Sequence, residues 1–503
     1  MIRRALCALA LMFPLSAAAQ TFQISGVDFS DSDYLTEIEL QEIAARYVNR
    51  PIGLSDLQEL VSEVQNLYGR SGVVTARAIL PPQEIDDGIL MVELVEAVVS
   101  GVELDGIERT RPEFFTRTLS LGVDEKPDFE ELERDFRIFD IAYDIRPTLS
   151  FRPGDDPGTT VAIIRADEPE RFTFTGSLDN FGSEETGELR ATVYARISSL
   201  TGWRDTLNAQ LQVSEGAYSG SIAYTRPIGA RGGNLQTSLS YSDSSVIAGP
   251  FAAVDIVSNN LSFSAGYSQP FRVRPQSHLF GSANIVFEQS DSELEGLPLS
   301  DQTLTEVVLA TGGLFQGEKQ NFAFNVGVKV GTADSQQVSE TEGSYQLLFA
   351  SANYARPLGE RFIFDASVTA QIAPDQNLPV ARLFSLGGPT TVRGYPLNVR
   401  SGDSGILARL QVNYGEPFRG GNDRNSWSYT PFAFTDLGVV IPFREDGSGL
   451  DSDQDILASV GAGIRIDWNS RARGLLVIAN PMKETLGFND LSPVFYAGID
   501  WDF

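Results

Sequence analysis

The sequence contains very few of the residues from which common catalytic and metal sites are built. Its 503 residues include one cysteine, Cys7, and one histidine, His278. Cys–His nucleophiles, Ser–His–Asp triads and Cys/His metal sites depend on these two residue types. No Gly-rich run is followed by the Lys and Ser or Thr of a phosphate-binding loop. The composition therefore argues against an enzyme, and we expect no metal and no cofactor.

Positive charge and long apolar runs are also scarce. The chain has 38 Lys and Arg against 67 Asp and Glu, a net charge of -29 at pH 7. This excess of negative charge repels the phosphates of DNA and RNA, so we expect no nucleic-acid partner. No segment after the N-terminus reaches the roughly 18 consecutive apolar residues of a transmembrane helix. An α-helical membrane protein is excluded on this count.

Residues 1–19 have the layout of a secretory signal peptide. Arg3 and Arg4 precede the apolar stretch 5–13, and residues 17–19 are the small alanines that signal peptidase requires. The apolar stretch is too short to span a bilayer. We expect cleavage before Gln20 and export of a mature chain that has no cysteine.

Residues 20–97 and 98–168 show the same order of elements twice: strand, helix, helix, strand, strand. In the first copy, a capping box of Ser55 and Gln58 is predicted to begin a helix whose apolar residues share one face. In the second copy, helices are predicted over 111–119 and 129–143. Two copies of one order predict two small α/β domains in series.

Residues 169–503 are rich in strictly alternating segments, such as 189–197, 362–372 and 456–466. Strands of about ten residues with one apolar face are typical of transmembrane β-barrels, whereas soluble sandwiches usually have strands of about five or six. An even strand number is required of a single-chain bacterial barrel. We place sixteen strand starts, near residues 171, 186, 203, 218, 233, 258, 277, 304, 320, 342, 360, 403, 427, 453, 473 and 493.

The predicted fold is mainly β: a 16-stranded transmembrane antiparallel β-barrel preceded by the two α/β domains. A closed barrel leaves no unpaired strand edge in hydrocarbon. The last strand is predicted to point Phe495, Ile499 and Trp501 outward and to end on Phe503. An aromatic end of this kind is typical of the signal recognised by barrel-assembly machinery. A simple interfacial anchor is the alternative.

One connection, residues 373–402, lacks this alternation. Loops of this length without secondary structure are usually functional or disordered. The connection contains the run Val392, Arg393, Gly394 and Tyr395. We therefore treat it as the first candidate for a functional element.

A second run lies on a predicted strand after this loop. Phe434, Asp436 and Gly438 occupy alternate positions, whereas Thr435 and Leu437 lie between them. Successive side chains of a strand point to opposite faces, so the first three residues are expected to face the lumen together.

The two runs resemble the paired motifs of one superfamily. Residues 392–395 are similar to the V-R-G-Y signature of barrels that carry polypeptide-transport-associated (POTRA) domains, and residues 434–438 to its F-x-D-x-G partner on the thirteenth strand. Residues 179–182 resemble the start of such barrels. Residues 72–88 resemble the first POTRA domain of two-partner-secretion transporters of the haemolysin activation/secretion type.

This resemblance implies an outer-membrane transporter of a Gram-negative bacterium, with POTRA domains at 20–97 and 98–168 in the periplasm. Its partner would be a large secreted β-helical exoprotein, translocated unfolded to the cell surface without nucleotide hydrolysis. Outer-membrane lipid would surround the barrel, and barrel-assembly machinery would act during biogenesis. The alternative is a barrel insertase of the same superfamily, which typically has more POTRA domains.

The resemblance also implies that loop 373–402 folds back into the lumen, where Arg393 meets Asp436. A guanidinium held bidentately by a carboxylate would pin the loop to the wall. Related transporters often begin with a helix that plugs the barrel, but here the first strand is predicted near Thr21. We therefore expect the loop itself, or nothing, to gate the pore.

Overall fold

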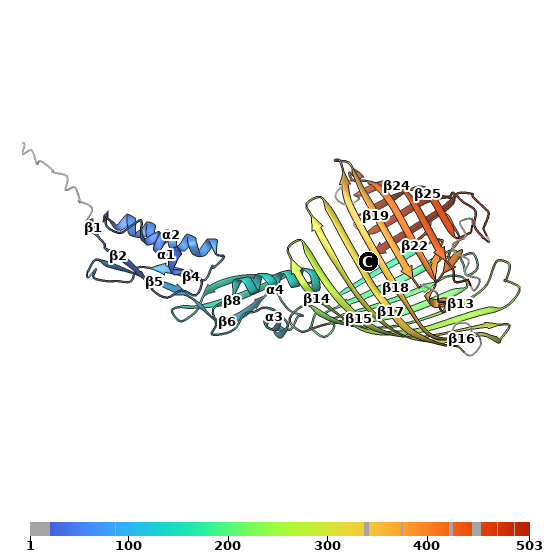
Figure 1. Cartoon of the computed structure of the whole chain (residues 1–503), viewed down its shortest axis with the longest axis horizontal. Helices are drawn as coiled ribbons and strands as arrows, with labels where there is room; N and C mark the ends of the chain where they lie inside the picture. The colour runs from blue at the N-terminus through green and yellow to red at the C-terminus, as the bar shows by residue number, and fades with distance from the viewer. Residues whose placement is uncertain are drawn as a thin grey trace, which may run out of the picture. The chain divides into compact units, whose positions relative to one another are not determined.

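The computed structural model describes residues 21–85, 87–335, 342–373, 376–421, 426–444, 454–469, 471–486 and 488–503 (Figure 1). The predicted signal peptide, residues 1–19, lies outside the described residues. The chain divides into two compact units. The first contains the described residues up to Asp105 with Ser120–Leu132 and Thr148–Arg165, and the second contains Gly106–Leu119, Glu133–Pro147 and Ala166–Phe503.

The first repeat is a small sheet packed against two helices. The sheet order is β2-β5-β4, with β2 parallel and β4 antiparallel to β5. The apolar face of α2, which includes Leu60, Val64 and Tyr68, lies in a core shared with the sheet and α1. The elements are β1 (Phe22–Gln23), β2 (Gly26–Phe29), α1 (Glu37–Ala44), β3 (Pro51–Ile52), α2 (Leu54–Arg70), β4 (Ala76–Ile79) and β5 (Ile89–Glu96).

The predicted start of α2 was wrong. The helix begins at Leu54, and its cap is Gly53, whose N–H donates to Asp56 Oδ2 at 2.8 Å. Ser55 is therefore the second residue of the helix and not its cap. An aspartate in the first turn satisfies the capping N–H and also lies at the positive end of the helix dipole.

The second repeat has the same order of elements. Its sheet order is β6-β8-β7, with β6 and β8 parallel. The described helices include none that is long and apolar enough to cross a membrane. The elements are β6 (Val98–Asp105), α3 (Pro112–Thr118), α4 (Phe129–Ala142), β7 (Pro147–Pro153) and β8 (Thr159–Ala166). The strands lie almost entirely in the first unit, whereas α3 and the part of α4 from Glu133 belong to the unit of the barrel.

A buried carboxylate connects the two repeats within the first unit. Glu96, at the end of β5, accepts hydrogen bonds from Tyr68 Oη at 2.9 Å and from Lys126 Nζ of the second repeat at 2.8 Å. Burial by itself would raise the pKa of Glu96, but hydrogen bonds from Lys126 and Ser32 hold the pKa below its ordinary value. Glu96 therefore stays ionised and keeps its partners at neutral pH.

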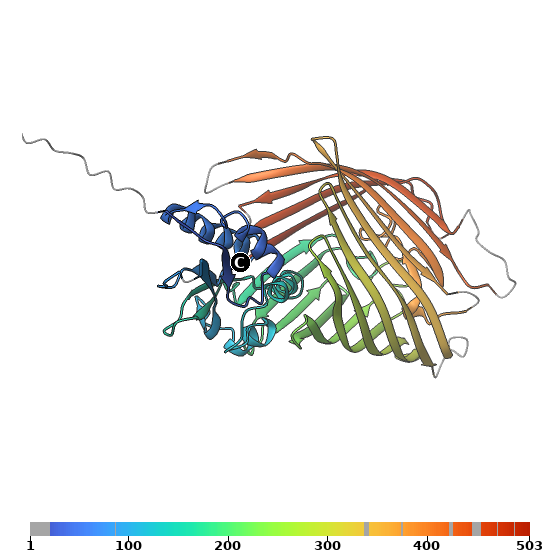
Figure 2. The same ribbon diagram turned by 60° about the vertical axis from the view of Figure 1, so that its left-hand side comes forward.

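The second unit contains a closed antiparallel β-barrel (Figures 1 and 2). Pairing of β27 with β9 closes the ring, and the short β23 (Phe418–Gly420) pairs with β24. In the described residues sixteen strands cross the wall, which confirms the predicted fold. They are β9 (Phe172–Asp179), β10 (Arg190–Ser198), β11 (Thr206–Val213), β12 (Ala217–Ile228), β13 (Gly233–Ser245), β14 (Ile256–Arg274), β15 (Ser277–Leu294), β16 (Leu297–Gly317), β17 (Gln320–Ser335), β18 (Gly343–Leu358), β19 (Phe362–Ile372), β22 (Ser404–Tyr414), β24 (Trp427–Ile441), β25 (Ile456–Trp468), β26 (Ala472–Pro481) and β27 (Val494–Asp502).

Three neighbouring strands are longer than expected. β14, β15 and β16 have 19, 18 and 21 residues, and β16 begins at Leu297 rather than near residue 304. About ten residues suffice to cross the hydrocarbon, so these strands continue beyond it. The apolar alternation stops where lipid contact stops, and for this reason the sequence pattern did not show these strand ends.

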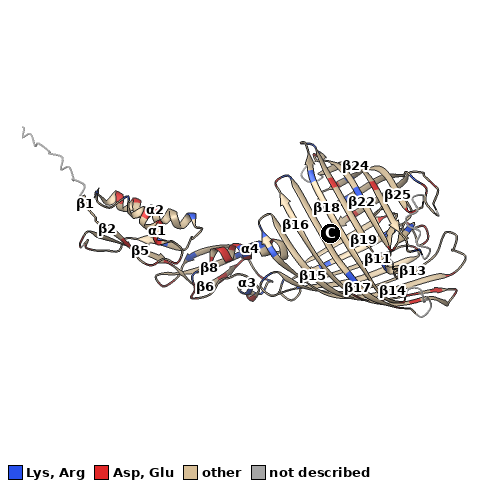
Figure 3. Ribbon diagram, viewed as in Figure 1, with Lys and Arg blue, Asp and Glu red and all other residues tan. Residues whose placement is uncertain are grey.

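The barrel wall is apolar outside and polar inside. On β13, Leu239 and Tyr241 are exposed to the lipid side, whereas Ser238 and Ser240 face the interior. Figure 3 shows the strands largely tan, with acidic positions gathered on α2 and α4. This arrangement makes the lumen a polar compartment into which a loop can fold.

Candidate functional site: a loop folded into the lumen

The described part of the long connection, residues 376–402, lies inside the barrel as a hairpin. Its two strands, β20 (Phe384–Leu386) and β21 (Arg400–Gly402), pair antiparallel. Before them a short 3-10 helix spans Val380–Arg382. Loop side chains contact the inner faces of strands that lie far apart around the wall, including β15 and β24. The loop therefore reaches across the interior.

The tip of the hairpin is a tight turn that depends on glycine. Gly387 and Gly388 have φ values of 110° and 96°, and Gly394 has 93°. These angles lie in the left-handed region, which L side chains rarely adopt. The Gly388 N–H donates to Tyr395 O at 3.0 Å. Thr391 Oγ1 accepts from Gly387 N and donates to Gly387 O. The turn presents the V-R-G-Y residues to the wall.

Arg393 and Asp436 form a bidentate ion pair inside the barrel. Arg393 Nε lies 2.7 Å from Asp436 Oδ2, and Arg393 Nη2 lies 2.7 Å from Asp436 Oδ1. The backbone N–H of Arg393 donates to the same carboxylate at 3.2 Å. Arg393 is 5% exposed and Asp436 is 0% exposed. Two parallel bonds to a fork-shaped cation fix the position and direction of the loop tip.

Further contacts hold the guanidinium of Arg393 on its other faces. Its Cζ lies 3.3 Å from the ring centroid of Phe434, the first residue of the strand motif. Its Nη1 donates to Gln411 Oε1 at 3.3 Å. A second cation, Arg409, approaches Asp436 Oδ1 to 3.5 Å and donates to Thr390 O at 2.8 Å. Asp436 thus forms ion pairs with two arginines.

The other three residues of the loop motif, Val392, Gly394 and Tyr395, also pack against the wall. The Gly394 N–H donates to Tyr496 Oη at 2.9 Å, and a Cβ at Gly394 would lie 3.2 Å from Pro481. Tyr395 Oη lies 2.7 Å from Lys483 O and 3.0 Å from a second backbone carbonyl. Val392 is fully buried in an apolar cluster with Leu386, Tyr395, Leu407, Val440 and Leu457.

Gly438 completes the strand motif by leaving room for the loop. A Cβ at this position would lie 2.6 Å from Leu386 Cδ1 and 2.9 Å from Val392 Cγ2. Real Cβ atoms do not approach so closely, so a side chain here would displace the hairpin. The structure therefore brings all seven motif residues together: Val392, Arg393, Gly394, Tyr395, Phe434, Asp436 and Gly438.

Two further arginines, which the sequence analysis missed, hold the base of the loop. Arg382 lies 2.9 Å from Glu306 and 3.0 Å from Glu288. Arg400 pairs with Asp455, which also lies 2.9 Å from Arg444. One signal could have revealed them. The loop contains three arginines, and single acids stand at inward positions of the predicted strands.

A cavity of about 350 Å³ lies beside the loop tip. Its lining mixes polar and apolar residues and carries three arginines, Arg393, Arg409 and Arg465. Within the described ranges, no three His, Cys, Asp or Glu residues gather in a way that could hold a metal ion. The arrangement is that of a clamped lumen loop beside an open, water-accessible space.

Phe503 lies at the closing seam of the barrel. Its N–H donates to Phe174 O of β9 at 3.0 Å, and its side chain is 82% exposed on the lipid side. Beyond the paired residues of β27 and β9, Asn180 prolongs the seam: its side-chain amide donates to Phe495 O and accepts from Ala497 N. The chain therefore ends on an aromatic ring in the membrane-facing wall.

Comparison with known proteins identifies a family. The family described as haemolysin secretion/activation protein ShlB/FhaC/HecB matches residues 158–466. A POTRA domain of the ShlB type matches residues 22–97. The first match covers more than half of the chain and includes the barrel from β9 into β25 with the loop motif.

Relatives of similar length belong to two kinds of transporter. The heme/hemopexin transporter protein HuxB of Haemophilus influenzae is 24% identical over 422 residues, which are 81% of this chain and 73% of HuxB. The outer membrane transporter CdiB of Dickeya dadantii is 24% identical over 420 residues, which are 78% of this chain and 72% of CdiB.

Solved structures share the fold. CdiB from Escherichia coli superposes with a TM-score of 0.70 at 18% identity, over 98% of this chain and 93% of CdiB. BamA from Haemophilus ducreyi lacking POTRA domains 1–3 gives 0.58 at 12% identity, over 96% of this chain and 100% of that one. At these identities the structures establish the architecture and no more. With the family match, they show that this chain belongs to the haemolysin secretion/activation protein family and is an outer-membrane β-barrel transporter with periplasmic POTRA domains.

Proposed function

We propose that this transporter moves one unfolded partner exoprotein through its lumen to the cell surface, and that the clamped loop controls the route. The observation that carries this proposal is the buried bidentate pair of Arg393 and Asp436 at the tip of a loop within the lumen. A loop held so firmly in a pore restricts passage, and release or movement of the loop would enlarge the passage.

The periplasmic repeats are proposed to receive the cargo. Residues 20–97 and 98–168 act as two POTRA domains, and the barrel begins at residue 169. In the two sheets β4 and β7 are edge strands. An exposed edge can accept an extended chain as an additional strand through backbone hydrogen bonds. This mode suits a cargo that is unfolded in transit and recognised by a limited segment.

The partner is proposed to be a large secreted β-helical protein. No nucleotide is required in this scheme, because folding of the cargo outside the cell would give transport its direction. Outer-membrane lipid covers the exposed apolar band, and Phe503 serves as a recognition element for the barrel-assembly machinery. Deletion of Phe503 is then expected to lower the amount of assembled barrel, which heat-modifiable migration on gels measures.

An insertase of the same superfamily is the competing function. The likeness to BamA concerns the fold alone. The family match and the relatives with transporter names favour transport. Depletion of an insertase would lower the levels of other outer-membrane barrels, whereas loss of this protein is expected to affect only its own exported partner.

The test first searches the neighbouring reading frames for a large exported β-helical protein and then co-expresses that protein with the transporter. Full-length transporter should release that protein at the cell surface, where externally added protease can reach it. A variant without residues 21–167 should assemble as a barrel but not secrete. Secretion by that variant at the normal level would contradict cargo docking on the repeats, and failure of the full-length protein to secrete would contradict transport itself.

A further inference from the structure

The turn between β10 and β11, residues 199–205, is held in a strained conformation. Ser199 and Arg204 have positive φ values of 54° and 57°, and Gly202 has 85°. Asp205 fixes this shape, because its carboxylate accepts from Thr201 N at 3.0 Å and from Tyr224 Oη at 2.9 Å. Non-glycine residues keep such angles only where the surroundings enforce them, and these positions often have a function.

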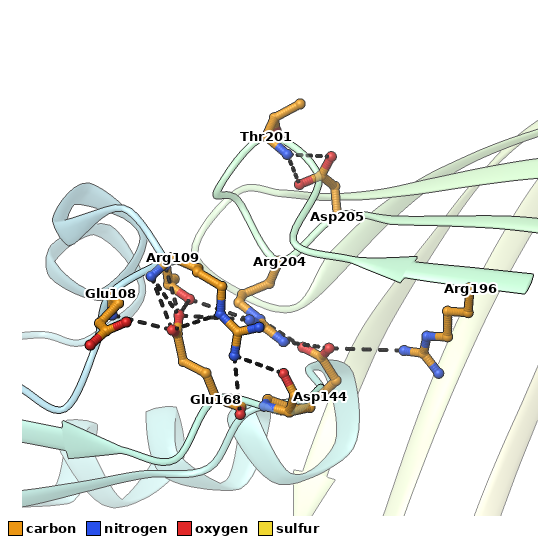
Figure 4. A network of polar contacts seen from close by, with 10 residues as sticks. Glu108, Arg109, Asp144, Glu168, Arg196, Thr201, Arg204 and Asp205 are labelled. Atoms are coloured by element: carbon orange, nitrogen blue, oxygen red, sulfur yellow. Dashed lines mark hydrogen bonds and ion pairs between the residues drawn. The ribbon is translucent and has the colours of Figure 1, made fainter. Parts of the chain in front are cut away.

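The strained turn places a charged side chain in a buried position (Figure 4). Arg204 is 3% exposed, and its Nε and Nη2 lie 2.8 and 2.5 Å from the two oxygens of Asp144. Its Nη1 donates to Thr110 Oγ1 at 3.3 Å. Asp144 follows α4 and Thr110 precedes α3. One barrel turn is thus bonded to both helical segments of the second repeat that belong to the same compact unit.

The carboxylate of Glu168 extends the network to the start of the barrel. Glu168, which precedes β9, accepts from Thr110 N at 2.7 Å, from Thr110 Oγ1 at 2.6 Å and from Arg109 N at 3.0 Å. Burial would raise the pKa of Glu168, but the bonds from Thr110 and Arg109 lower it to about 2. Glu168 therefore carries its charge throughout the physiological pH range.

Close packing surrounds the network. Arg111 N donates to Gly202 O at 2.9 Å, and Arg117 of α3 lies 4.6 Å from the ring centroid of Trp203. At the next turn, between β12 and β13, a Cβ on Gly232 would lie 2.9 Å from both Ala142 and Ile138 of α4. The helices therefore touch two turns at the same end of the barrel with no space between them.

We propose that the turn 199–205 is a joint that holds the helices of the second repeat against the periplasmic rim of the barrel, and that Arg204 is its positioning residue. The joint fixes α3 and the part of α4 from Glu133, which share the unit of the barrel, at its entrance, so that a cargo segment bound at these helices is handed to the lumen. This inference rests on the proposed transport function. A buried arginine is unnecessary for closing a hairpin, for which two-residue turns such as Asn-Gly suffice.

The experiment compares Arg204→Ala with Arg231→Ala in the full-length protein. Arg231 is an exposed arginine on the neighbouring turn, so it controls for loss of positive charge at the rim. Three properties are measured for each: heat-modifiable barrel assembly, affinity of the purified transporter for the N-terminal fragment of the neighbouring exoprotein, and secretion of that exoprotein. Arg204→Ala should assemble and bind normally but secrete at least about tenfold less, because the half-buried Asp144 then keeps only the more distant Arg196, at 3.9 Å, and the turn is no longer bonded to the helices.

A distance measurement separates positioning from other structural effects. With the single cysteine replaced (Cys7→Ala), spin labels at Glu113→Cys on α3 and Glu360→Cys on the turn between β18 and β19 give one defined pair. The distance distribution should be narrow in the parent and in Arg231→Ala, and broad in Arg204→Ala. Arg204→Lys keeps the charge without the fork geometry and should lie between the two.

The outcomes distinguish the joint from the transport function. A narrow distribution or normal secretion in Arg204→Ala overturns the joint, as does a loss of secretion that weaker cargo binding explains fully. If the parent itself does not secrete, transport fails, and the distance distributions still decide whether the joint exists. If Arg204→Ala does not assemble, Arg204→Lys and Thr110→Val are used for the same comparison.

Discussion

The two opposite sides of the barrel interior are built in different ways. On β11 to β14 the inward side chains are mostly hydroxyls and amides, and they are largely half-exposed. On β22 and β24 to β27 the loop covers part of the inward side, and the residues beneath it form two buried apolar clusters. The hydroxyl wall, as we call the first side, includes Asn208, Gln210, Gln212, Ser219, Ser221, Gln236, Ser238, Ser240, Ser242, Ser258, Asn260, Ser262 and Ser264.

This difference indicates where a passing chain would meet least resistance. Half-exposed hydroxyls and amides exchange their hydrogen bonds between water and a polypeptide at a net cost of about 1 kcal/mol or less per bond. On the loop side, removal of one partner from a buried ion pair costs about 3–5 kcal/mol. We therefore expect cargo to pass along the hydroxyl wall, while the loop side acts as a folded core that keeps the loop in place.

The largest expected effect comes from breaking the loop clamp. Arg393→Ala leaves Asp436 buried with only the more distant Arg409, so the loop should lose about 3–5 kcal/mol of its anchoring free energy. Secretion should fall to near background while the barrel still assembles, as heat-modifiable migration would show. Arg465→Ala is the matched control, since Arg465 is an exposed arginine of the same cavity. Equal losses in both variants would contradict the clamp.

A charge swap refines this test. Arg393→Asp combined with Asp436→Arg should restore secretion only in part, because the new guanidinium at position 436 would face Arg409, whose Nε now lies 3.5 Å from Asp436. Adding Arg409→Gln removes this repulsion and should raise secretion further. If the triple variant secretes no better than the double variant, the second arginine is irrelevant to the clamp.

A smaller effect is expected from crowding the same wall. Gly438→Ala places a methyl group within 2.6 Å of Leu386 Cδ1 in the present arrangement, so the hairpin must shift. Such overpacking costs about 1–3 kcal/mol. Proteolysis of the loop from outside the cell should become faster than in the parent. Gly474→Ala is the control, because its Cβ would meet Ile466 at an ordinary 3.6 Å.

The smallest effect is expected on the hydroxyl wall. Ser240→Asp adds a charge at a half-exposed position, where surface substitutions usually change stability by about 0.5 kcal/mol or less. The same change on the loop side, Val440→Asp, puts an unpaired charge in the fully buried apolar cluster. Thermal unfolding of purified protein should separate the two variants clearly. Similar destabilisation by both would remove the distinction between the walls.

The sequence alone predicted the barrel because its signal is local and repeated. Alternation along each strand, together with an even strand number, follows from one face meeting lipid and the other meeting water. The pairing of Arg393 with Asp436 was also predictable, although only through the resemblance of residues 392–395 and 434–438 to the motifs of a superfamily. The first prediction needs no knowledge of distant contacts, whereas the second takes its distant contact from the paired motifs of the superfamily.

The tertiary structure decided the other contacts between residues far apart in the sequence. Nothing near Arg382 indicates that its partners are Glu306 and Glu288, which precede it by 76 and 94 residues. Nothing near Arg204 indicates either that its guanidinium donates to Asp144, 60 residues earlier. Buried charges are stable only when the fold brings partners to them, so their positions follow from the closed barrel and not from any local pattern.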